Sequence, residues 1–90
     1  MGIALIKMKI MPTSPEVDLE ELKERIKEVI EKNLGKPTDF SEEPIAFGLK
    51  AIIVGFELNE SIELDSIEEN LKEVENVNSV QVIDMRRAFG

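Results

Sequence analysis

The order in which two kinds of hydrophobic spacing follow one another limits the folds open to this chain more than any other feature. Apolar residues recur at every second position in 3–10, which predicts a β-strand, and at three- and four-residue steps from Leu19 onward, which predicts an amphipathic helix. The segment 36–46 is polar and contains Pro44, so we expect at most a short edge strand there. Further along, the spacing predicts a strand over 47–58, a second amphipathic helix over 64–74 and a last strand over 77–85.

This order of strand, helix, strand, strand, helix, strand is typical of the ferredoxin-like βαββαβ sandwich, an α+β fold. In that fold, two helices cover one face of a four-stranded antiparallel sheet. Right-handed crossovers would place the first and third strands side by side in the middle, which fits the strongly apolar character of both. Because 90 residues can build one hydrophobic core but not two, we expect residues 1–90 to form a single domain.

Short signals at the segment ends support the same order. Pro12 and Pro15 interrupt the first strand and predict a loop. Asp18 is suited to cap the free amides at the start of the first helix, and Glu21 occupies the reciprocal position of a capping box. Gly35, followed by a proline two residues later, is expected to mark the end of that helix.

Alternation within the strands predicts which side chains face the helices. In the first strand Ile6, Met8 and Ile10 share one parity, so the other parity would display Lys7 and Lys9 on an open sheet face. In the last strand the same alternation sets Val80 and Val82 against Gln81, Ile83 and Met85.

Composition excludes several functional classes. The chain has no Cys and no His, so it lacks a disulfide framework, thiolate zinc ligands, a Cys nucleophile and the usual general base. Its net charge of −8 disfavours general nucleic-acid binding. No apolar run approaches the roughly 20 residues of a membrane span, and no glycine-rich nucleotide-binding loop occurs. We therefore expect a cytoplasmic protein with no direct nucleic-acid or membrane partner, no bound cofactor or metal, and no covalent chemistry.

Two short motifs at the start of the third strand carry candidate chemistry. An aromatic ring at Phe47, beside Gly48, could anchor the chain in a pocket of a partner, although the burial tendency of Phe favours a core position. The adjacent Glu42 and Glu43 could bind a cation or a basic partner, although such pairs are more often only solvated.

The basic residues offer a third set of candidates. Arg86 and Arg87 form the only adjacent basic pair, and a guanidinium there could engage a carboxylate or phosphate, or could simply pair with nearby carboxylates of the chain. Lys7, Lys9 and Lys50 could line one side of the sheet, or could protect strand edges from pairing with another chain.

Three segments together resemble archaeal elongation factor 1-beta, a family of guanine-nucleotide exchange domains. They are Ile10-Met11-Pro12-Thr13-Ser14-Pro15 before Val17-Asp18-Leu19, Glu42-Glu43-Pro44-Ile45-Ala46-Phe47-Gly48-Leu49-Lys50-Ala51, and Val77-Asn78-Ser79-Val80-Gln81-Val82 before Asp84-Met85-Arg86-Arg87. The resemblance spans the whole chain, and the segment from Glu42 to Lys50 is its most specific part.

The resemblance implies a ferredoxin-like exchange factor for elongation factor 1-alpha, the GTPase that delivers aminoacyl-tRNA, bound in its GDP-bound and nucleotide-free forms. It implies that Phe47 fits a pocket of the GTPase, with Gly48 and Lys50 beside it. The basic residue that reaches the magnesium and phosphate region falls on Arg87, with Arg86 its neighbour. Eukaryotic relatives carry Lys next to the last residue there, whereas in this chain three residues follow Arg87.

Two other functions use the same architecture and stay open on the residues alone. The first is a small regulatory module that binds a metabolite at a homodimer interface. The second is an RNA- or ribosome-associated protein that uses Lys7, Lys9 and Lys50, although the net charge and the lack of stacking aromatics disfavour it.

Overall fold

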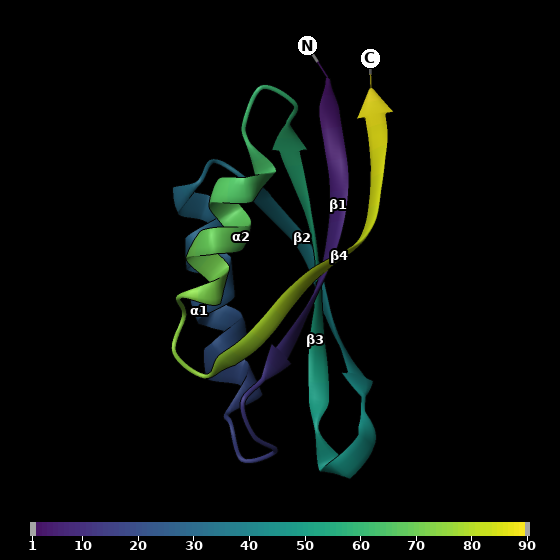
Figure 1. Ribbon diagram of the computed structural model, residues 1–90. Coiled ribbons are helices and arrows are strands. Elements are labelled where there is room, and N and C mark those ends of the chain that lie inside the picture. The colour runs from purple at the N-terminus through teal and green to yellow at the C-terminus, as the bar shows by residue number, and fades with distance from the viewer. Residues whose placement is uncertain (1, 90) are drawn as a thin grey trace.

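Strands and helices alternate as the hydrophobic spacing predicts in the computed structural model, which describes residues 2–89 (Figure 1). The elements are β1 (Ile3–Pro12), α1 (Leu19–Lys32), β2 (Lys36–Pro44), a short 3-10 turn (Ala46–Gly48), β3 (Lys50–Asn59), α2 (Leu64–Lys72) and β4 (Val77–Phe89).

The four strands form one antiparallel sheet in the order β2-β3-β1-β4. The predicted placement of the first and third strands in the middle is therefore confirmed. Both helices cover the same face of the sheet and leave the other face open (Figure 1). This is the ferredoxin-like βαββαβ sandwich that the element order indicated.

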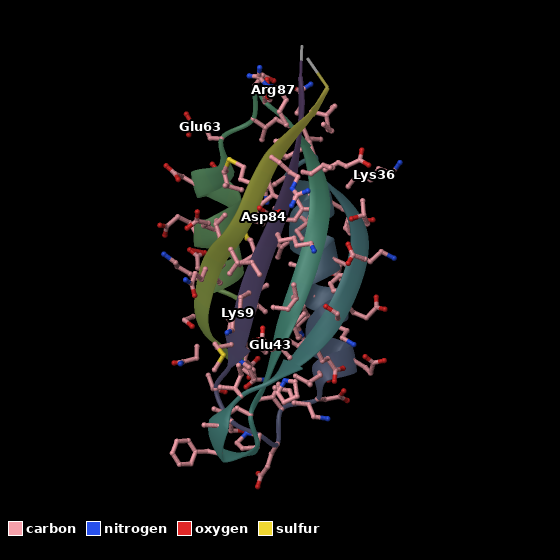
Figure 2. All side chains as sticks on the ribbon, turned by 90° about the vertical axis from the view of Figure 1, so that its right-hand side faces the viewer. Lys9, Lys36, Glu43, Glu63, Asp84 and Arg87 are labelled. Carbon is pink, nitrogen blue, oxygen red and sulfur yellow. The ribbon has the colours of Figure 1, made fainter. Side chains whose placement is uncertain are left out.

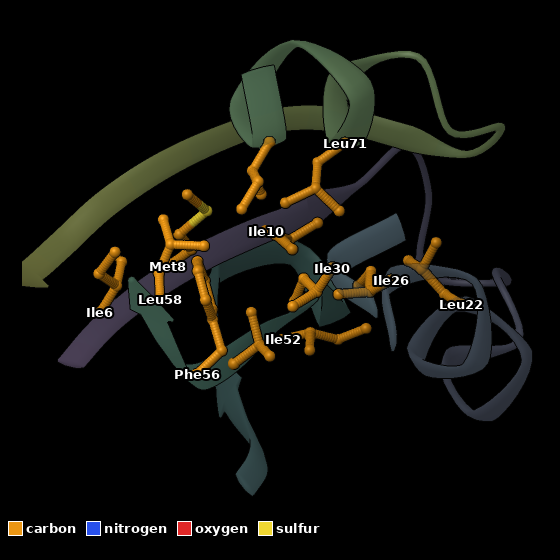
Figure 3. Close-up of a cluster of buried hydrophobic side chains, with 12 residues drawn as sticks. Ile6, Met8, Ile10, Leu22, Ile26, Ile30, Ile52, Phe56, Leu58 and Leu71 are labelled. Carbon is orange, nitrogen blue, oxygen red and sulfur yellow. The ribbon is translucent and has the colours of Figure 1, made fainter. Parts of the chain in front are cut away.

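The hydrophobic core lies between the helices and the covered face of the sheet (Figure 3). In β1, Ile6, Met8 and Ile10 are buried, as their shared parity predicts, and they pair in register with β3. Burying each such side chain contributes about 1.5–3 kcal/mol to folding. The core comprises Ile6, Met8, Ile10, Leu22, Ile26, Ile30, Ile52, Val54, Phe56, Leu58, Ile67 and Leu71.

Helix α1 begins as predicted but ends differently. The Asp18 carboxylate accepts hydrogen bonds from the amides of Glu20 and Glu21, which confirms the cap. At the other end, Leu34 adopts the left-handed conformation with φ 67°, and the Gly35 amide donates to the Ile30 carbonyl at 2.9 Å. Gly35 is needed for a different reason than expected, because a Cβ there would overlap the Ile30 side chain.

Two strand boundaries differ from the sequence prediction. The edge strand β2 spans nine residues, Lys36–Pro44, rather than a short piece, since Pro37 and Pro44 lie near its ends and an edge strand tolerates a missing amide. Strand β3 begins at Lys50, so the residues from 47 to 49 precede it. The turn over 46–48 reverses the chain between β2 and β3.

Strand β4 is longer than predicted and its alternation is interrupted. It runs to Phe89, which places Arg86 and Arg87 inside a strand. A β-bulge shifts the register between Lys7 and Met8, so Met85 pairs with Ile6 and lies on the same face as Val82, contrary to the simple alternation. The extra residue of a bulge reverses the parity of the residues that follow it.

Candidate functional site

The tip of the β2–β3 hairpin displays an aromatic ring. Phe47 lies in the turn between the two strands with φ 64°, and 94% of its surface is exposed. The expectation of a core Phe at a strand start, which the burial tendency favours, is therefore wrong. Below the turn, the Ile45 amide donates to the Leu49 carbonyl at 2.7 Å and closes the hairpin.

The conformation of this tip is costly. A non-glycine residue in the left-handed region loses about 1 kcal/mol or more, and Gly48 follows with φ 78°. Because the ring is exposed, burial of apolar surface does not offset this conformational cost. A strained, exposed aromatic side chain at a loop tip has the features of an anchor for another protein.

Gly48 provides a test of how firmly this turn is held. A Cβ there would meet only the Pro15 Cβ at 3.9 Å, so space is available and the strain comes from the positive φ alone. We expect Gly48→Ala to lower the free energy of unfolding by about 1 kcal/mol, measured by urea denaturation. Gly48→Asn should lose less, because Asn tolerates the left-handed region. Equal losses for the two variants would contradict this account.

Two glutamates hold the base of the hairpin from opposite faces of the sheet. On the helix side, Glu42 accepts a hydrogen bond from Lys23 Nζ at 2.8 Å, and Lys23 also contacts Glu20 at 3.0 Å. On the open side, Glu43 pairs with Lys9 at 3.8 Å (Figure 2). Glu42 and Glu43, two of the sequence candidates, therefore each have a partner within the chain.

The Glu42 pair predicts a stability change with pH. The hydrogen bond from Lys23 lowers the pKa of Glu42 below its usual 4.5, and the bond to Glu42, followed by that to Glu20, raises the pKa of Lys23 above 10.5. A carboxyl whose pKa is lowered by folding contributes stability above its unfolded pKa and loses it as the pH falls through the folded pKa.

We therefore expect Glu42→Gln to lower the thermal midpoint slightly at pH 7, with the difference from the unmodified protein closing below about pH 4. Thermal unfolding followed by circular dichroism at several pH values measures this. Glu43→Gln is the matched control and should change the midpoint less, since its pair is longer. A Glu42→Gln difference that stays constant down to acid pH would contradict the assignment.

A shallow recess adjoins the hairpin tip. Its volume is about 160 Å³, and it lies between the β1–α1 loop and the turn. Its lining residues are Pro12, Ser14, Pro15, Leu19, Gly48 and Lys50. The Thr13 amide donates to the Asn76 carbonyl at 2.9 Å and fixes the loop to the α2–β4 connection. The recess places the cationic Lys50 beside Gly48, the residue that follows Phe47.

The two adjacent arginines point to opposite faces of the sheet. Arg87 pairs in register with Ala4 and Arg86 with Leu5, and successive residues of a strand alternate between faces. Arg86 Nε donates to Asp84 at 3.1 Å, and Arg87 Nε donates to Glu60 at 2.6 Å. The pairing with local carboxylates that the sequence allowed is therefore present for both side chains.

The β2–β3 turn, which contains Phe47, and the final part of β4, which contains Arg87, lie at opposite ends of the sheet (Figure 1). Arg87 pairs with Ala4, which pairs with Leu58, whereas the turn with Phe47 precedes Lys50. At about 3.3 Å per residue, the eight residue-to-residue steps from Leu58 to Lys50 span roughly 26 Å. The molecule is 42 Å long along its main axis, so a partner that contacts both residues must extend along most of it.

The lysines do not form one basic stripe. Lys7 and Lys9 lie on the open face, as predicted, but Lys50 has the parity of the buried Ile52 and lines the recess on the helix side. A hollow of about 220 Å³ over Gly55 brings Lys7 and Arg86 together with Asp39 and Asp84. The open face therefore carries both signs of charge, which does not favour a phosphate backbone.

Within residues 2–89, the structure contains no helix long and apolar enough to cross a membrane.

Comparison with known proteins gives consistent matches. The family description "EF-1 guanine nucleotide exchange domain" matches residues 5–88. The chain is 45% identical over 86 residues to elongation factor 1-beta from Methanococcus maripaludis, covering 94% of this chain and 97% of that protein. It is 48% identical over 88 residues to elongation factor 1-beta from Methanosarcina barkeri, covering 97% and 99%.

Among solved structures, similar chains share the fold only. An ACT domain from the GTP pyrophosphokinase of Chlorobium tepidum has a TM-score of 0.63 at 15% identity and covers 88% of this chain and 96% of that one. The 30S ribosomal protein S6 from Thermotoga maritima has a TM-score of 0.65 at 20% identity and covers 97% and 88%. Because this architecture serves many functions, these two likenesses do not select one.

Proposed function

The chain belongs to the family of EF-1 guanine nucleotide exchange domains and is an exchange factor for elongation factor 1-alpha, and we propose that it acts by binding the nucleotide-free GTPase more tightly than the GDP-bound form. The observation that carries the function is the family match over residues 5–88, together with relatives of nearly equal length. We further propose that residues 1–90 act as one domain in the cytoplasm.

Differential binding is sufficient to release GDP. If the exchange factor binds the nucleotide-free GTPase more tightly by some factor, GDP binding to the complex is weakened by the same factor. Each 1.4 kcal/mol of such preference increases the dissociation constant of GDP tenfold. No covalent step and no bound cofactor or metal of the exchange factor's own is needed for this mechanism.

We assign the partner contacts to the two ends of the molecule. Phe47 is the aromatic anchor at one end, with Gly48 in its turn and Lys50 in the adjoining recess. Arg87 is the cationic contact at the other end, directed at the phosphate and Mg²⁺ region of the GTPase. The separation of roughly 26 Å along β3 supports contacts to two separate parts of the GTPase surface rather than to one pocket.

The position of Arg87 within a strand bears on its role. Strand β4 pairs with β1 on both sides of Arg87, from Met85 opposite Ile6 to Phe89 opposite Ile3 across a register shift, so the guanidinium is carried by paired backbone. A cation held near the phosphates competes electrostatically with Mg²⁺, which normally bridges phosphate oxygens and the protein. Loss of Mg²⁺ weakens the binding of GDP. Arg86 faces away from Arg87, so we assign it the smaller contribution.

The test is release of a fluorescent GDP analogue from the cognate elongation factor 1-alpha at low and at millimolar Mg²⁺. We expect the release rate to rise with the concentration of this protein and to saturate. The analogue-bound GTPase without exchange factor is the reference, and circular dichroism establishes that both proteins are folded. An unchanged release rate with folded proteins would contradict the proposed mechanism.

A further inference from the structure

Arg87 is held by a carboxylate from a different part of the chain. Its Nε donates to Glu60 Oε2 at 2.6 Å, and Glu60 lies in the turn between β3 and α2. The two residues are 27 positions apart in sequence, so the contact depends on the fold. Both side chains are partly exposed, and Arg87 lies at the end of the sheet where β1 begins and β4 ends (Figure 2).

Gly2, the residue just before β1, positions Glu60. The Glu60 amide donates to the Gly2 carbonyl at 3.0 Å, which ties the turn to the start of the chain. Gly2 is buried, and a Cβ there would overlap the Glu60 carboxylate. The missing side chain at Gly2 therefore provides the space in which the carboxylate meets Arg87.

The geometry of the bond leaves a useful part of the guanidinium available. A guanidinium has five N–H donors, and the contact with Glu60 uses the one on Nε. The two terminal Nη groups form the edge that binds phosphate or carboxylate oxygens in a fork. A carboxylate on Nε fixes the plane of the group and reduces the side-chain entropy that docking must remove.

We propose that Glu60 is a positioning residue for nucleotide exchange, which orients Arg87 so that its Nη edge meets an anionic group of the GTPase. This inference rests on the proposed function of Arg87. Since Glu60 acts through Arg87, its removal should change exchange only when Arg87 is present. Exposed pairs of this kind contribute modestly, so we expect Glu60→Ala to lower the saturating rate of GDP release about threefold to fivefold.

The first test is a double-mutant cycle on GDP-analogue release with Glu60→Ala, Arg87→Ala and both together. We expect Glu60→Ala to have no further effect when Arg87 is absent, and Glu60→Gln, whose amide oxygen can still accept from Nε, to restore most of the rate. Glu63→Ala is the matched control: it removes the same charge at the same end of the molecule (Figure 2), but Glu63 makes no capping hydrogen bond at the start of α2, and Arg87 pairs with Glu60 instead.

Three outcomes of this cycle would overturn the proposal. They are an equal loss from Glu60→Ala with and without Arg87, a faster release that shows Glu60 to compete for Arg87, and a loss from Glu63→Ala as large as that from Glu60→Ala. Failure of the proposed function is distinguishable, because then the unmodified protein would not accelerate release at all.

The second test does not depend on the GTPase. In the free protein, the Nε–H of Arg87 should give a ¹⁵N-resolved NMR signal protected from solvent exchange, and Glu60→Ala should remove that protection. Gly2→Ala keeps every charge but displaces the carboxylate, and we expect it to reproduce both the lost protection and the slower release. An Nε–H signal that neither variant changes would overturn the proposal.

Discussion

Replacing Phe47 by alanine should slow the stimulated release of GDP from elongation factor 1-alpha tenfold or more. A buried aromatic anchor at the centre of an interface contributes about 2 kcal/mol or more, and 1.4 kcal/mol already corresponds to tenfold. The same change should alter the free energy of unfolding by no more than about 0.5 kcal/mol relative to the unmodified protein. Phe47 is 94% exposed, and substitutions on the surface usually have effects this small.

The measurement is the release rate of a fluorescent GDP analogue against exchange-factor concentration, with urea unfolding of the same variant. Leu34→Ala is the matched control. Leu34 is also a large apolar residue with positive φ, at 67°, and is 76% exposed, but it lies between α1 and β2, away from the hairpin tip. We expect this control to release GDP at the unmodified rate. Normal release by folded Phe47→Ala would remove Phe47 from the mechanism.

Replacing Arg87 by alanine should slow release about tenfold at millimolar Mg²⁺ and much less in excess chelator. In the mechanism we propose, the guanidinium disfavours Mg²⁺, and a chelator achieves the same result without it. Arg87→Lys should retain only part of the rate, because it keeps a cation at this position but loses both the fork and the Nε contact with Glu60.

The experiment compares these variants at two Mg²⁺ concentrations. Arg86→Ala is the matched control, since it removes the same charge from the adjacent residue on the opposite face of the sheet, and we expect it to cause the smaller loss. A loss from Arg87→Ala that is equal with and without Mg²⁺ would rule out a role in metal displacement. Equal losses for both arginines would indicate that net charge matters more than direction.

The architecture could be predicted because each segment buries a pattern that sequence displays directly. Apolar residues stand at every second position in β1 (Ile6, Met8 and Ile10) and at every fourth in α1 (Leu22, Ile26 and Ile30). Each element therefore has one apolar face, and the two apolar faces pack against each other. The cap at Asp18 was equally readable, because a side-chain oxygen there satisfies amides only a few residues away. Local geometry determines these features.

Features that depend on long-range register could not be read in this way. The bulge in β4 reversed the parity of Met85, and no residue type at that position marks an extra residue in a strand. The end of α1 also differed, for a local reason: Leu34, rather than Gly35, has the left-handed conformation, and Gly35 is instead the position where a Cβ would overlap the Ile30 side chain.

The candidate residues divide in the same way. The residues around Phe47 and Arg87 resemble a known family, and this resemblance indicated both as candidate contacts with a GTPase. The family match agrees with the exchange function that the resemblance implied. Their separation by most of the sheet, and the opposite directions of Arg86 and Arg87, required the strand register. Neighbouring positions in sequence reveal nothing about Glu60 as the partner of Arg87.

The sequence by itself therefore determined the order of elements, the core and the family, because these depend on periodicity and on residue identity along the chain. Only the tertiary structure decided that Phe47 is exposed, that Lys50 lies beside Gly48 rather than with Lys7, and that Arg87 is held by Glu60. The physical reason is that exposure and contact depend on which segments far apart in sequence lie next to each other. The register of the antiparallel strands across the whole sheet determines these neighbours.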